Sequence, residues 1–151
     1  MIEAGERILP NESAQIANFL KTSLIARGVT FYENCALNES AVTVNSNSVT
    51  IQVNKDKTIE VEKVLVSIGR KPNTDDIGLN NTKIKIDDNG NILVNDFLQT
   101  EDKHIYAAGD CIGKLQLAHV SSKEAILAVE HMFNGNGLPL NYDKMPKCIY
   151  T

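Results

Sequence analysis

Two short apolar runs of the sequence end in residues that could bind a ligand. One of them, Ile105 to Ala108, is followed by Gly109 and Asp110. A carboxylate directly after a buried strand can bind a sugar or polyol hydroxyl, ligate a metal or cap a helix. The next helix is predicted several residues later, which disfavours capping, and the small residues before Asp110 leave space for a flat or chain-like group. Asp110 is therefore a candidate ligand-binding residue.

The other run, Val64 to Ile68, ends at Gly69 and is followed by Arg70-Lys71-Pro72-Asn73. Because glycine lacks a Cβ, a ligand could approach the backbone at Gly69; the alternative is an inter-domain turn that uses glycine for its φ angle. Glu3 closes the first predicted strand, where a carboxylate can accept both hydroxyls of an adenosine ribose. The glycine-rich turn that normally precedes such a residue is absent from the sequence, so Glu3 taken alone is better explained as a solvated surface residue.

Leu117-Ala118-His119 leads into a helix predicted from about His119 to Asn134. The free N–H groups and the positive dipole end of a helix start stabilise negative charge on a bound ligand. A lone histidine at a helix start is more often a cap or packing residue than a catalyst, which favours that role for His119. No nucleophile and base pair, metal cluster or closely spaced dithiol accompanies these residues.

The elements that would position these residues predict an α/β protein with partial Rossmann-like units. Met1 to Ala4 is interpreted as a strand end, and residues 12–27 as an amphipathic helix with Asn11 as its N-cap and Gly28 as its stop. A strand from Val29 to Tyr32 follows. Strand, helix and strand together form the crossover unit of a parallel sheet.

The middle of the chain has the pattern of β-structure. The run VTVNSNSVTIQVNKDKTIEV alternates apolar and polar residues with turn residues at 45–47 and 54–57, which predicts a three-stranded antiparallel meander. Residues 64–68 are continuously apolar, as in a strand buried on both faces. A hairpin is predicted at 84–94, with Asn89-Gly90 supplying the positive φ angles of its turn. In the last helix we expect Ile126, Val129 and Phe133 to share one face and Gly135 to end it.

Composition and charge exclude several classes of protein. The 151 residues, of which 42% are hydrophobic and 23% charged, suit one soluble globular domain. A net charge of −4 gives no basic field for nucleic acid. No apolar run approaches the ~20 residues of a membrane span, and no secretory signal is present, so a cytoplasmic protein is expected. Cys35, Cys111 and Cys148 are too few and too widely spaced for a disulfide framework and are expected to be reduced thiols.

Read together, the segments EAGERILP, VSIGRKPN, TEDKHIYAAGD, and LQLAH followed by PKCIYT resemble, in this order along the whole chain, the dihydrolipoamide dehydrogenases of the pyridine nucleotide-disulfide oxidoreductase family. Glutathione and mercuric reductases share the GR-x-P-N and Thr-to-Gly-Asp signatures, whereas LAH and the ending CIYT favour the lipoamide enzymes. The resemblance implies a homodimeric flavoprotein. It would oxidise dihydrolipoamide on the lipoyl domain of 2-oxo acid dehydrogenase complexes and pass electrons through a redox disulfide and FAD to NAD.

The resemblance also implies roles for individual residues. Glu3 would bind the adenosine ribose of NAD, and Leu37 and Gly69 would contact NAD through their backbone. Asp110 would bind the ribitol chain of FAD. The flavin would be bordered by Gln116, Leu117, Ala118 and His119, where the helix dipole would stabilise the negative charge that the flavin pyrimidine edge gains on reduction.

Residues 1–73 are accordingly expected to be the second half of an NAD-binding domain, 74–143 the returning part of an FAD-binding domain and 144–151 the start of a dimerisation domain. The family's glycine-rich FAD motif, C-x-x-x-x-C disulfide and His-Glu base are not among these residues. We therefore expect an internal fragment that has no catalytic residue or metal site and no turnover of its own. The alternatives are a stand-alone nucleotide-binding or interaction module, or a fragment of another disulfide reductase such as mercuric or glutathione reductase.

Overall fold

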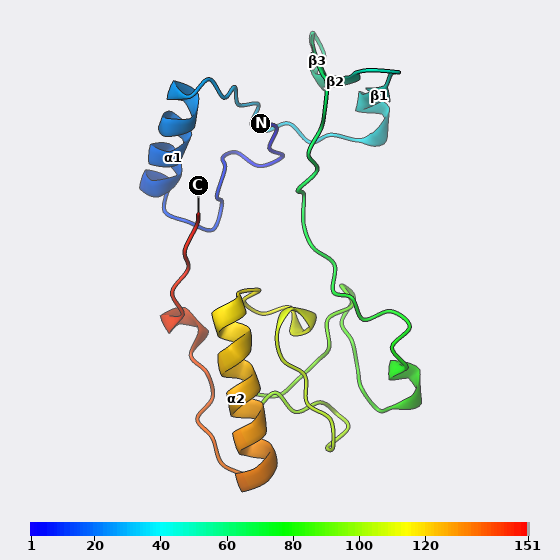
Figure 1. The fold of residues 1–151 in the computed structure, drawn as a ribbon, viewed down its shortest axis with the longest axis vertical. Coiled ribbons are helices and arrows are strands. Elements are labelled where there is room, and N and C mark those ends of the chain that lie inside the picture. The colour runs from blue at the N-terminus through cyan, green and yellow to red at the C-terminus, as the bar shows by residue number, and fades with distance from the viewer. Residues whose placement is uncertain (151) are drawn as a thin grey trace. The chain divides into compact units, whose positions relative to one another are not determined.

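The computed structural model of the protein describes residues 1–150, and the chain divides into two compact units, Met1–Ser67 and Ile68–Thr151 (Figure 1). The helices of the described residues are α1 (Ala14–Ala26) and α2 (Ala118–Asn134), and the strands are β1 (Val42–Val44), β2 (Val49–Asn54) and β3 (Lys57–Val61). Neither helix is long and apolar enough to cross a bilayer. The expected division into three domains stays a prediction.

Helix α1 confirms the predicted helix but begins later than expected. Ser13, and not Asn11, is the N-cap, and its Oγ accepts the N–H of Ile16 at 3.3 Å. The reason lies in Arg7, whose guanidinium donates to the carbonyls of Leu9 at 2.6 Å, Pro10 at 2.9 Å and Glu12 at 2.8 Å. These three bonds hold the segment before α1 in a loop.

The predicted apolar stripe of α1 is largely uncovered by the described residues. Ala17 is the only residue of the helix that is buried, whereas Phe19 is 76% exposed. Periodicity identified the helix correctly, because spacing depends only on the chain itself. Burial of the stripe depends on a neighbour that the described residues do not provide.

The predicted parallel sheet is not formed within residues 1–150. The only part of this sheet present in the described residues is one parallel bridge between Ile2 and Tyr32. In this bridge the N–H of Glu3 donates to the Tyr32 carbonyl, and the N–H of Tyr32 donates to the Met1 carbonyl, both at 2.9 Å. The prediction of a buried strand at 64–68 is also wrong. Leu65 is 92% and Ile68 94% exposed, because no described strand lies beside this segment to pair with its backbone.

The predicted antiparallel meander is confirmed. Strands β1, β2 and β3 pair in chain order, with Val44 opposite Val49 and Val49 opposite Val61. A small core of Cys35, Ile51 and Val53 forms beneath the sheet, and the thiol of Cys35 donates to the Val53 carbonyl at 2.9 Å.

The second unit is built around a core of Ile92, Leu98, Ile112, Leu127 and Ala128. The predicted hairpin is reduced to one antiparallel bridge between Ile86 and Ile92. Its turn is organised by the Asp87 carboxylate, which accepts the N–H groups of Asn89 at 2.9 Å and Asn91 at 2.8 Å. Gly90 has a φ of +85°, but Asn89 does not have a positive φ, so the predicted Asn-Gly turn is wrong at its first position.

Helix α2 has the predicted end but a different buried face. Gly135 closes the helix with a φ of +64°. Ile126, Val129 and Phe133, expected to share one face, are 60%, 51% and 78% exposed, so the described residues do not bury that face. The buried residues of α2 are Val120, Glu124, Leu127 and Ala128. Because the buried face contains the charged Glu124, the spacing of apolar residues in the sequence does not identify this face.

Candidate functional site

Asp110 lies in a turn that only glycine can begin. Gly109 has φ +87° and ψ −157°, a region closed to residues with a side chain, and a Cβ there would come within 3.3 Å of the Ser121 Oγ in α2. A 3₁₀ turn at Asp110–Ile112 follows directly. The turn therefore fixes Asp110 close to the first turns of α2.

The Asp110 carboxylate is accessible and only weakly engaged. Its Oδ2 lies 2.5 Å from a guanidinium nitrogen of Arg70, and the two side chains are 40% and 65% exposed. An ion pair this exposed contributes little, about 0–1 kcal/mol. Sequence reasoning did not place Arg70 beside Asp110, because forty residues separate them and no local pattern connects them. The carboxylate can accept hydroxyl groups from a polyol at this position.

The start of α2 lacks a side-chain cap. Leu117 is the N-cap and offers no side-chain acceptor, so the first N–H groups of the helix are left for a ligand or solvent. Gln116 and Leu117 are half-buried, whereas Ala118 and His119 are exposed. The His119 Nε2 lies 2.9 Å from the Pro146 carbonyl.

A buried carboxylate beneath the turn was also missed. Glu124 of α2 has no exposed surface and accepts the Gly109 N–H at 2.6 Å and the Tyr142 hydroxyl at 2.9 Å. Burial, reinforced by the hydrogen bond to Glu124 and its charge, raises the pKa of Tyr142 far above its usual range. Burial also raises the pKa of the Cys111 thiol, which disfavours its reactive thiolate form.

In the first unit, Glu3 and Leu37 lie on neighbouring segments. The half-buried Glu3 accepts the Gly5 N–H on its Oε1 at 2.7 Å, which orients the carboxylate. Its carbonyl accepts the Cys35 N–H at 2.9 Å, and Leu37, 39% exposed, follows two residues later. One oxygen of Glu3 is thus fixed by its own loop while the other can accept a further hydroxyl.

Gly69 belongs to the second unit. It is exposed, has a φ of +150°, and a Cβ built on it would meet nothing within 4 Å. Open backbone of this kind can be approached by a ligand. The structure thus brings Asp110 and the start of α2 together in one unit and Glu3 and Leu37 in the other.

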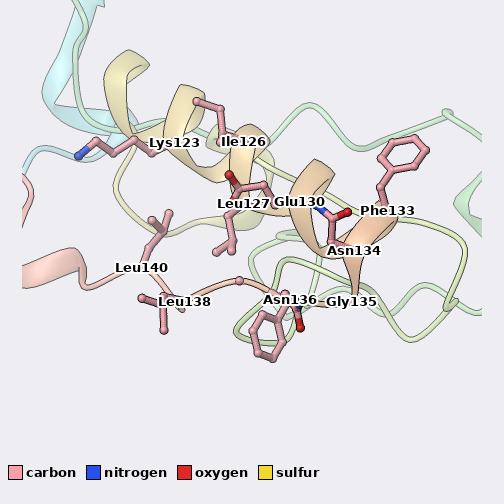
Figure 2. Close-up of a pocket in the computed structure, with 12 residues that line it drawn as sticks. Lys123, Ile126, Leu127, Glu130, Phe133, Asn134, Gly135, Asn136, Leu138 and Leu140 are labelled. Atoms are coloured by element: carbon pink, nitrogen blue, oxygen red, sulfur yellow. The ribbon is translucent and has the colours of Figure 1, made fainter.

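Two surface hollows lie in the second unit. The larger, about 1220 Å³, runs between α2 and the segment that carries Leu138 and Leu140, and none of the residues predicted to bind a cofactor lines it (Figure 2). The smaller, about 440 Å³, is lined by Gln116 together with Arg70, Lys71 and Lys114. Within residues 1–150, no group of three His, Cys, Asp or Glu side chains is placed to hold a metal ion.

A family model for pyridine nucleotide-disulphide oxidoreductases matches residues 1–125. Among curated relatives, a dihydrolipoyl dehydrogenase of Bacillus subtilis is 45% identical over 154 residues, covering 100% of this chain and 32% of its own length. A dihydrolipoyl dehydrogenase of Corynebacterium glutamicum is 33% identical, covering 99% of this chain and 33% of its own length. The chain therefore spans about a third of the length of these relatives.

Solved structures give the same result. LpdA from Mycobacterium tuberculosis matches with a TM-score of 0.82 and 30% identity, over 93% of this chain and 30% of its own. The HOCl-induced flavoprotein disulfide reductase RclA from Escherichia coli matches with a TM-score of 0.80 and 27% identity, over 94% of this chain and 32% of its own. The fold is that of a flavoprotein reductase. The chain belongs to the pyridine nucleotide-disulphide oxidoreductase family, as its sequence motifs indicated.

Proposed function

We propose that the chain supplies parts of the FAD and NAD sites of a dihydrolipoyl dehydrogenase. The observation that carries this proposal is the accessible Asp110 carboxylate, presented by the Gly109 turn beside the uncapped start of α2. The similarity to dihydrolipoyl dehydrogenases along the whole chain supports it.

The residues present fit a flavin cofactor. A carboxylate accepts hydroxyl groups, so Asp110 would hold the ribitol chain of FAD. Gln116, Leu117, Ala118 and His119 would border the flavin, and the positive end of α2 would stabilise negative charge on it. When bound, FAD supplies electron transfer between a dithiol and NAD. The residues of this chain would bind it and tune it electrostatically.

The first unit fits a nicotinamide dinucleotide less completely. Glu3, already held by the Gly5 N–H, would accept the hydroxyls of the adenosine ribose with its remaining oxygen. Leu37 would offer a backbone contact to the same cofactor. For Gly69, which belongs to the second unit, the proposed role is likewise a backbone contact with NAD. The open backbone of Gly69 supports its role, while Leu37 rests on its place beside the Glu3 segment.

The activity belongs to a longer protein. We propose that this protein is a cytoplasmic homodimer that reoxidises dihydrolipoamide on the lipoyl domain of a 2-oxo acid dehydrogenase complex. Residues 1–73, 74–143 and 144–151 would belong to its NAD-binding, FAD-binding and dimerisation domains. The sequence contains no C-x-x-x-x-C dithiol, so these 151 residues should not turn over lipoamide alone.

A second candidate is another flavoprotein disulfide reductase. The structural similarity to RclA, with a TM-score of 0.80, favours it. In this case the cofactor roles of Glu3, Gly69 and Asp110 would be unchanged, and the substrate would differ.

The proposal is tested with a hybrid enzyme. Residues 1–150 would replace the aligned segment of the Bacillus subtilis dihydrolipoyl dehydrogenase. The purified hybrid is expected to show the flavin absorption band and NADH-dependent reduction of lipoamide. A flavin-containing hybrid that reduces other disulfides but not lipoamide would favour the second candidate.

A further inference from the structure

Glu124 is a buried acidic residue whose position the predicted cofactor roles do not explain. Its side chain has no exposed surface, which is unusual for a carboxylate unless its oxygens are paired. Here both oxygens are engaged: Oε2 accepts the Gly109 N–H at 2.6 Å, and Oε1 accepts the Tyr142 hydroxyl at 2.9 Å. The carboxylate thus joins the turn before Asp110, helix α2 and the 3₁₀ turn at Tyr142–Lys144.

The hydrogen bond from the Gly109 N–H to Glu124 restrains the backbone directly before Asp110, and this backbone determines the direction of the Asp110 side chain. Gly109 occupies a φ and ψ region that is open to glycine, and because glycine can adopt many other conformations as well, the backbone alone does not fix this turn. A charged acceptor makes a stronger hydrogen bond with a backbone N–H than a neutral one does. Ser121, one helical turn before Glu124, packs its Oγ within 3.3 Å of the place a Gly109 Cβ would occupy. The turn is therefore both bonded to α2 and in close contact with it.

We propose that Glu124 is a positioning residue for the flavin site, which holds the Gly109 N–H and thereby fixes the direction of the Asp110 carboxylate. This inference rests on the proposed role of Asp110 toward FAD. The Tyr142 hydroxyl donates to the other oxygen of the buried carboxylate, and the Tyr142 ring centroid lies 4.7 Å from the Lys114 Nζ.

Three substitutions separate positioning from simple structural support. Glu124→Ala removes the acceptor from both donors. Glu124→Gln keeps an oxygen for the Gly109 N–H and offers its amide to the Tyr142 oxygen, so it should restore the turn. Tyr142→Phe is the matched control, because it removes one hydrogen bond from the same buried carboxylate but leaves the bond to Gly109 in place.

The first measurement needs no cofactor. Amide hydrogen exchange of the 151-residue chain, resolved by NMR, is expected to show a protected Gly109 N–H in the original protein, in Tyr142→Phe and in Glu124→Gln. In Glu124→Ala, exchange at Gly109 should be about 10- to 100-fold faster, while amides in the middle of α2 keep their protection. Unchanged protection of Gly109 in Glu124→Ala would overturn the proposal.

The second measurement is the affinity for FAD of the hybrid enzyme described above, titrated by quenching of flavin fluorescence. Glu124→Ala is expected to weaken FAD binding about tenfold, and Tyr142→Phe and Glu124→Gln by less than about threefold. Equal weakening by Glu124→Ala and Tyr142→Phe would mean general structural support and would also overturn the proposal. A hybrid with the original sequence that binds no FAD would refute the proposed function and the flavin part of this inference, whereas the exchange measurement still decides whether Glu124 holds the turn.

Discussion

The geometry of the turn at Gly109 predicts how much the free energy of unfolding should fall when Gly109 is replaced by alanine. In Gly109→Ala, the alanine must adopt φ +87° and ψ −157°, which costs about 1–3 kcal/mol. Its Cβ would also lie 3.3 Å from the Ser121 Oγ, a close contact that adds about 1 kcal/mol. The free energy of unfolding should therefore fall by about 2–4 kcal/mol.

A matched control is Gly135→Ala at the end of α2. Gly135 also has a positive φ, +64°, but lies in the ordinary left-handed region, and its Cβ position is open. The expected loss there is only about 1–2 kcal/mol. Adding Ser121→Ala to Gly109→Ala should restore the contact part, about 1 kcal/mol, and leave the backbone part.

The assay is urea unfolding followed by circular dichroism at 222 nm. The unfolding midpoints of the variants are compared only if the free energy of unfolding depends on urea concentration with the same slope in each of them. A loss in Gly109→Ala no larger than that in Gly135→Ala would refute the claim that the turn requires glycine at position 109. Full recovery on adding Ser121→Ala would show that the contact alone, and not the backbone, makes glycine necessary.

Three further predictions concern pH, association and activity. Because the pKa of Tyr142 is raised in the folded protein, its contribution to stability is complete below pH 10.0 and is lost as the pH rises above it; unfolding midpoints against pH should show this decline, and Tyr142→Phe should reduce it. The exposed segment 64–68 should drive self-association, so Leu65→Lys with Ile68→Lys should shift the sedimentation pattern toward monomer, and a monomeric original chain would contradict this. The 151-residue chain should show no NADH-dependent reduction of lipoamide, and measurable turnover by the pure chain would show this expectation to be wrong.

Local patterns predicted the elements whose formation depends on nearby residues. The meander followed from alternation and turn residues, since β1, β2 and β3 pair with one another. Gly135 ended α2 as expected, because a left-handed residue after a helix is a local requirement. The cap of α1 was misplaced by two residues because Arg7 holds the preceding carbonyls in a loop. This interaction leaves no periodic signal.

Features that depend on distant partners could not be predicted in this way. The apolar run 64–68 has the composition of a buried strand, yet burial requires neighbouring strands that residues 1–150 do not supply. The buried face of α2 was not identified from the sequence, because Glu124 interrupts its apolar pattern. At the candidate site, Asp110 was predictable from its place after a short apolar run. Its contact with Arg70 and the Glu124 bond to Gly109 were not, because each joins segments far apart in the sequence.

The central claim is that Asp110, presented by the Gly109 turn, holds the flavin cofactor of a longer enzyme. Its most direct test is the visible absorption spectrum of the desalted hybrid enzyme, with and without Asp110→Ala, after both proteins have been shown to have the same circular dichroism. We expect a flavin band in the hybrid and its loss in the variant. A band of equal strength in both proteins would contradict the role of Asp110, and a folded hybrid without the band would contradict the assignment of the flavin site.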